Sequence, residues 1–79
     1  MLLLKIVSPE KVIFSGMVTS VMVPGTLGSF EILTGHAPII SSLDSGKVIY
    51  NSESGFRQLH ISGGFVEVKR NEVSLCVEL

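Results

Sequence analysis

Hydrophobic and polar residues alternate along most of this chain with a period of two, which is the pattern of a β-strand buried on one face. The clearest case is residues 72–79, where Val73, Leu75 and Val77 share one face. Residues 17–23 also alternate but are apolar at most positions of both faces, which predicts a strand covered on both sides. No window of ten or more residues keeps a helical stripe free of Gly and Pro. The pattern therefore predicts an all-β chain.

Short runs rich in β-branched and aromatic residues predict the remaining strands. The stronger runs are residues 2–7, 47–50, 56–61 and 65–69, and the weaker ones are residues 12–14, 30–33 and 39–43. Turn-forming residues separate them at 8–11, 24–26, 44–46, 52–55 and 70–72. Gly63 and Gly64, inside an apolar stretch, predict a β-bulge or a close backbone approach. Strands at this spacing predict a small β-sandwich or barrel.

The composition indicates that part of the surface belongs to a partner. Seventy-nine residues form one small domain, and a chain of this size buries only about 60% of its unfolded surface. Even so, 46% of the residues are hydrophobic and 16% are charged, against about 25% charged in an average soluble domain. A membrane helix is excluded, because the apolar run at residues 1–7 contains Lys5 and a span needs ~20 residues. The run also lacks the basic start and cleavage site of a signal peptide.

Charge and cysteine content exclude several classes of function. The net charge is −1, with six Lys and Arg against seven acidic residues, which gives no strong field for nucleic acid or anionic lipid. The aromatic residues lack the interleaved basic clusters of single-strand binding platforms. Cys76 is the only cysteine, so we expect no internal disulfide and a cytoplasmic protein. His36, His60 and Cys76 lack the paired spacing of a zinc site, so we expect neither a metal nor a cofactor.

The segment from Pro24 to Leu43 contains the residues that could suggest catalysis or phosphate binding. His36 has only Glu31 as a nearby acid and no spaced nucleophile, so a contact role is favoured over catalysis. The stretch Pro24–Gly28 lacks the lysine and the helix of a phosphate-binding loop, and predicts a tight turn. Apolar residues crowd this segment, namely Leu27, Phe30, Ile32, Leu33, Ile39 and Ile40. A thin core can hardly hide all of them, which predicts an exposed apolar contact surface.

Ordered motifs then connect this chain to a known family. They are IVSPEK at residues 6–11, FSG at 14–16, VPGTxG at 23–28, ILxGHAPII at 32–40, LxxGxV at 43–48, ISGGFVEV at 61–68 and NxV at 71–73. Together they resemble the N-terminal domain of the epsilon subunit of bacterial F-type ATP synthase, from the first strand to the last. The resemblance implies a β-sandwich of about ten short strands. It also implies a non-catalytic rotor subunit that couples proton- or sodium-driven ring rotation to ATP synthesis.

The resemblance also implies the partners and the residues that face them. The gamma subunit would be contacted by Ser8, His36 and Ser41, with Ala37 and Pro38 shaping the contact. The ring of c subunits would be contacted by Thr26, Leu27, Gly28, Ser29, Phe30 and Glu31. Many relatives carry acidic residues in this ring-facing loop, where the present chain has Leu27 and Ser29. We therefore expect a more apolar contact with the ring, shared with Glu31.

The resemblance further implies location and regulation. We expect a peripheral protein on the cytoplasmic face of the bacterial cell membrane, without insertion into it. Most family members continue into a C-terminal helical hairpin that inhibits ATP hydrolysis. We expect residues 1–79 to form a single epsilon-type β-sandwich domain with no C-terminal helical domain, and so little or no such inhibition if the chain is complete. The alternatives are a stand-alone β-barrel binding module for an oligonucleotide or small ligand, and a small hydrolase that uses His36.

Overall fold

The computed structural model describes residues 1–79 and contains eight β-strands. The strands are β1 (Leu2–Val7), β2 (Val12–Gly25), β3 (Gly28–Leu33), β4 (Ile39–Leu43), β5 (Gly46–Ser52), β6 (Gly55–Ile61), β7 (Gly63–Lys69) and β8 (Glu72–Glu78). The all-β prediction is confirmed. No helix is long and apolar enough to cross a bilayer. The runs at residues 12–14 and 17–23, predicted as separate strands, form the single strand β2, because Ser15 and Gly16 continue the pairing with β1.

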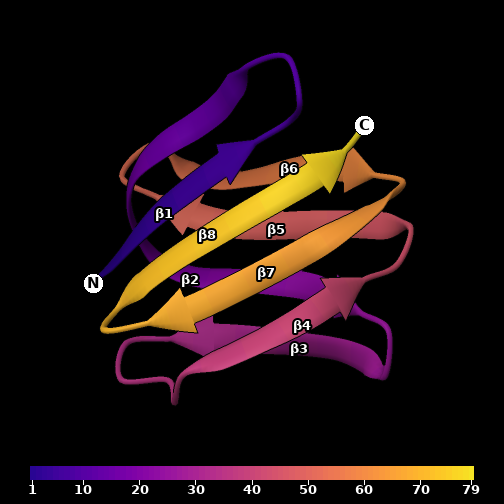
Figure 1. Cartoon of the computed structure of the whole chain (residues 1–79). Coiled ribbons are helices and arrows are strands. Elements are labelled where there is room, and N and C mark those ends of the chain that lie inside the picture. Colours follow the sequence, from indigo (N-terminus) through magenta and orange to yellow (C-terminus); the bar gives the residue numbers. More distant parts are fainter.

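The strands are arranged in two layers (Figure 1). β1, β8, β7 and β4 are neighbours in one layer, which we call the front layer. β3, β5 and β6 lie in the other layer, the rear layer, together with the second half of β2. The long strand β2 connects the layers, since its first half pairs with β1. β1 and β8 run parallel, whereas all other pairs are antiparallel.

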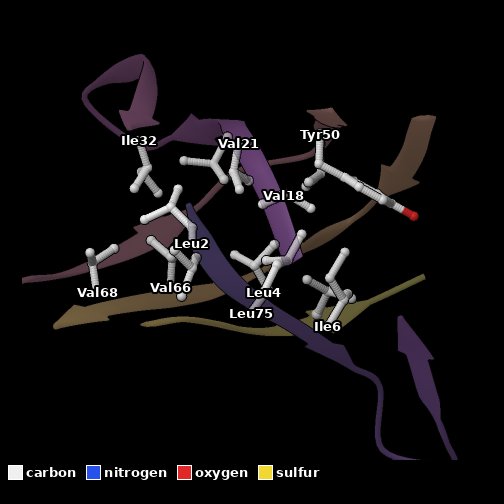
Figure 2. Packing of buried hydrophobic residues seen from close by; sticks show 14 of the residues in the cluster. Leu2, Leu4, Ile6, Val18, Val21, Ile32, Tyr50, Val66, Val68 and Leu75 are labelled. Carbon is white, nitrogen blue, oxygen red and sulfur yellow. The ribbon is translucent and has the colours of Figure 1, made fainter. Parts of the chain in front are cut away.

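The inner faces of the two layers form one apolar core (Figure 2). Sixteen hydrophobic residues are buried, and no polar or charged residue is. In the front layer the alternate residues Leu2, Leu4 and Ile6 of β1 point inward, as do Val66 and Val68 of β7. Burying one such side chain contributes about 1.5–3 kcal/mol. The intervening residues of these strands must therefore form the outer face of the layer.

Two backbone features fix the register between β7 and β8. Arg70 and Asn71 both have positive φ, at 51° and 59°, and form the two-residue turn between the paired Lys69 and Glu72. At the other end of β7, Gly64 has φ of 145°, and a Cβ there would overlap the carbonyl oxygen of Cys76. The predicted close approach of the backbone at Gly63–Gly64 is thus confirmed.

Candidate interaction surfaces

The outer face of the front layer has an apolar end. Phe65 of β7 and Val7 of β1 both pair with Cys76 of β8, and the three side chains make a row across three strands. Phe65 is 50% exposed. The row after it is polar, since Glu67 and Lys5 both pair with Ser74. Apolar residues are therefore adjacent on three strands at this end, whereas Leu3 and Ile40 are exposed singly elsewhere on the same face.

An open cavity of about 290 Å³ lies at this apolar end, and we call it the front slot. Its lining residues are Val7, Ser8, Pro9, Gly64, Phe65, Cys76, Val77 and Glu78. Glu78 is the only charged residue among them. The close approach of Gly64 to β8 brings the strands together at the slot, so its shape depends on the backbone of β7 and β8.

Ser8 and His36, two of the three residues that the resemblance predicts to face gamma, lie at opposite ends of the front layer. Ser8 follows β1 in a turn closed by its N–H, which donates to the carbonyl of Lys11 at 2.9 Å. The loop of His36 is held near the start of β8, because the Gly35 N–H donates to Oδ1 of Asn71 at 2.7 Å. Between these ends lies the outer face with Phe65.

The other predicted gamma contacts lie around His36 and on β4. The His36 ring is half-buried, its Nδ1 is 2.7 Å from the carbonyl oxygen of Ala37, and its centroid is 6.3 Å from that of Phe30. Ala37 and Pro38 are exposed. Ser41 donates a hydrogen bond to its neighbour's carbonyl and lines a cavity beside the β2–β3 hairpin, away from the front slot. The His36 ring thus bonds within its own loop, which suits a contact surface better than an acid–base pair.

The β2–β3 hairpin carries the six residues predicted to face the ring. Thr26, Leu27, Gly28 and Ser29 form an exposed tip, with Leu27 fully exposed. Phe30 packs over Gly25, where a Cβ would lie 2.8 Å from its ring. Glu31 is exposed on the outer face of the rear layer, paired with Met22. The structure therefore gathers four of the six at the tip, while Phe30 supports the hairpin and Glu31 lies along its side.

The hairpin tip is fastened to the end of β4. The N–H of Thr26 donates to the carbonyl of Ser42 at 3.2 Å, and the hydroxyls of the same two residues lie 3.1 Å apart. The N–H of Asp44 donates to the carbonyl of Pro24 at 2.8 Å. Because β4 pairs with β7, the hairpin is connected directly to the front layer.

Of the apolar residues exposed on the front face, only Ile40 was predicted from the sequence to belong to a contact surface. Phe65, Val7 and Cys76 come from strands far apart in the chain and meet only through the pairing of β1, β7 and β8. Ile40, also strongly exposed, lies on this face beside Glu67. Because Val66 and Val68 face the core, period-two alternation predicts that Phe65 points outward. The alternation within one strand does not predict which residues of other strands lie beside Phe65.

Comparison with known proteins gives a consistent result. Residues 1–79 match the family model described as the beta-sandwich domain of the delta/epsilon chain of ATP synthase. The ATP synthase epsilon chain of Chlorobium limicola is 47% identical over 76 residues, which covers 95% of this chain and 86% of that protein. The corresponding chain of Chlorobaculum tepidum is 45% identical with the same coverage. That of Leptospira borgpetersenii is 38% identical and covers 92% of this chain but 58% of that protein.

Two solved structures share the fold. A chain in the Euglena gracilis mitochondrial ATP synthase, in a structure of its OSCP, F1 and c-ring, superposes with a TM-score of 0.89 at 24% identity. It covers 96% of this chain and 49% of that one. A chain in the central stalk and c-ring of the Tetrahymena thermophila mitochondrial ATP synthase gives a TM-score of 0.81 at 16% identity, over 99% and 63% of the two chains.

Proposed function

This chain belongs to the family of ATP synthase delta/epsilon chains, and we propose from its two surfaces how it works in that enzyme. It is an epsilon-type, non-catalytic subunit of the membrane-associated enzyme and is peripheral to the membrane. The outer face of the front layer, with Ser8 and the His36 loop at its ends, binds the gamma subunit. The β2–β3 hairpin tip binds the ring of c subunits. Residues 1–79 act as a single β-sandwich domain in this role.

The observation that supports this function is the stiff connection between the two surfaces. A coupling subunit must pass torque from the ring to gamma without yielding between its contacts. Here the tip is hydrogen-bonded to β4 through Thr26 and Ser42, and β4 is paired along its length with β7. The sandwich beneath is closed by sixteen buried apolar side chains, and such interiors are close-packed and deform little.

Most of the residues predicted from the sequence fit one of the two contacts. Leu27 and Ser29 meet the ring at the exposed tip, with Glu31 at its side, and Phe30 keeps the hairpin packed on Gly25. At the gamma contact, Ala37 and Pro38 present the exposed edge of the His36 loop. Ser41 is half-buried on β4, where it pairs with the buried Val66 and lines the cavity beside the hairpin. We place the subunit on the cytoplasmic face of the bacterial cell membrane, where it turns with the ring and is not inserted in the bilayer.

Co-purification tests the proposed function. An affinity-tagged chain, recovered from detergent-solubilised membranes of its own cells, should bring down gamma and c subunits. The catalytic subunits should follow only when gamma is present. Recovery of the chain free of every ATP synthase subunit would contradict the proposal. It would favour the alternative of a stand-alone module that binds an oligonucleotide or a small ligand.

A charge placed in the His36 loop tests where gamma binds. His36→Asp puts a carboxylate where the ring nitrogen now bonds the Ala37 carbonyl, and an unpaired charge in an interface costs a few kcal/mol. We expect the affinity for purified gamma to fall by at least about tenfold. The matched control is His60→Asp, the same change at an exposed position of β6 in the rear layer. Equal affinities for the two variants, with circular dichroism showing both folded, would contradict the assigned gamma contact.

A further inference from the structure

We propose that the front slot is the socket of the gamma contact: it receives one large apolar side chain of gamma, and a lysine or arginine of gamma beside it pairs with Glu78. This inference rests on the proposed function, because it specifies how gamma is held on the front face. The sequence motifs gave no role to Phe65, Cys76, Val77 or Glu78, which line the slot.

The small volume and open shape of the slot suit a single side chain of a partner. Sites for small molecules and cofactors are typically about 300–1,000 Å³ and enclose most of the ligand. The slot measures about 290 Å³, at the lower end of that range, and is open rather than enclosed, so it would leave most of a small ligand exposed but can take one protruding side chain. Recessed pockets that take a single apolar anchor are where binding energy concentrates in protein interfaces.

The walls of the slot are already shaped to receive that anchor. Phe65 and Val7 flank Cys76 across three paired strands, which gives a continuous apolar wall. The backbone beneath is fixed, because a Cβ at Gly64 would overlap the Cys76 carbonyl and lie 2.9 Å from Cα of Val77. A pocket whose backbone is fixed before binding loses little conformational entropy when it is filled.

The position of the slot indicates gamma as the occupant, and Glu78 sets the charge expected beside the anchor. Glu78 is exposed at the slot and is its only charged residue, so the partner is expected to bring a cation next to its apolar anchor. Ser8 connects the slot to the rest of the gamma contact, since it lines the slot and is also a predicted gamma-facing residue. Its hydroxyl donates only a long hydrogen bond of 3.4 Å, to the carbonyl of Lys11. The slot is therefore continuous with the proposed gamma surface.

Two pairs of variants test the socket with purified gamma from the same enzyme. Phe65→Ala removes one wall and should weaken gamma binding by at least about tenfold. Phe56→Ala is the matched control, because Phe56 is 72% exposed but lies on β6 of the rear layer, and it should change the affinity by less than about twofold.

Glu78→Gln should reduce the salt dependence of binding, whereas Glu53→Gln, in the β5–β6 turn, should leave it unchanged.

The only cysteine gives a second measurement that needs no variant. Cys76 is half-buried at the slot, and its reaction with N-ethylmaleimide is followed by the mass of this chain. An anchor seated in the slot should slow that reaction by at least about tenfold in the gamma complex. This reaction is measured on the unmodified protein, so a Cys76 that stays as reactive in the complex as in the free chain contradicts the socket even if Phe65→Ala fails to fold.

The outcomes separate this inference from the proposed function. If the unmodified chain forms no complex with gamma, the proposed function fails and the socket with it. If the complex forms while Cys76 stays as reactive as in the free chain and Phe65→Ala binds gamma normally, only the socket is overturned. The socket is also overturned if a second copy fills the slot, seen as a dimer that Phe65→Ala abolishes and gamma does not dissociate.

Discussion

The front slot and the hairpin tip are built in opposite ways, although each depends on a glycine with positive φ. Gly64 at the slot is enclosed, because an added Cβ would overlap the Cys76 carbonyl. Gly28 at the tip has φ of 126° and nothing within 4 Å of such a Cβ. The slot is thus shaped by strand pairing within a core layer, whereas the tip is shaped by a local turn and its hydrogen bonds to β4.

This difference matches the two roles proposed for the surfaces. A recessed site with a fixed backbone holds one partner in one orientation, which suits a lasting contact with gamma. A projecting tip with Leu27 fully exposed, whose backbone is held to β4, meets the ring through its side chains. We therefore expect the slot to be sensitive to backbone changes and the tip to side-chain changes.

The largest expected effect is on the backbone at the slot. Gly64→Ala must move β7 away from β8 and strain a left-handed residue, so we expect a loss of about 3 kcal/mol or more in the free energy of unfolding. Gly28→Ala has the same φ strain without the overlap and should cost about 1 kcal/mol. Urea denaturation of both variants measures the difference. Similar losses would show that the slot backbone is no more constrained than the tip.

Much of the fold could be predicted from the sequence, because period-two alternation and turn residues are local signals. The prediction at Gly63–Gly64 was correct because glycines inside a strand usually mark a bulge or a place where another backbone comes close. The break predicted inside β2 was wrong in detail, because Ser15 and Gly16 lower strand propensity but still pair with Lys5 and Leu4 of β1. Tertiary pairing overrode local preference there.

The candidate surfaces were harder to predict from the sequence than the fold. The turn at the tip could be predicted because its residues are contiguous in the chain, whereas its role toward the ring was implied only by the resemblance. The row of Val7, Phe65 and Cys76 was missed, since it forms only when β1 pairs in parallel with β8, its partner from the far end of the chain. Ser41 was named by resemblance, and the structure places it beside the hairpin cavity. Which face a residue occupies follows from register, and long-range register is not a local signal.

A smaller effect is expected where the tip is fastened to β4. Thr26→Val removes the hydroxyl that lies 3.1 Å from the Ser42 hydroxyl and keeps the shape of the side chain. We expect about 1 kcal/mol of stability to be lost, with faster amide hydrogen exchange at residues 26–29. Thr34→Val, at an exposed position of the next loop, is the control. Unchanged exchange at the tip would mean that the backbone bonds from Thr26 and Asp44 hold the hairpin by themselves.

The smallest effect on stability is expected at Leu27, where the change should appear in function instead. Leu27→Ser alters a fully exposed side chain, so the free energy of unfolding should change by less than about 0.5 kcal/mol. If the tip buries Leu27 against the ring, losing about 1 kcal/mol of that burial lowers affinity for isolated c-ring about fivefold. Leu33→Ser, on the same hairpin but distant from its tip, should bind the ring normally. Stability alone cannot distinguish an exposed leucine that contacts nothing from one that a partner covers, so ring binding is the measurement that decides. Equal ring binding by both variants would show that Leu27 is not part of the contact, which Ser29 and Glu31 would then make.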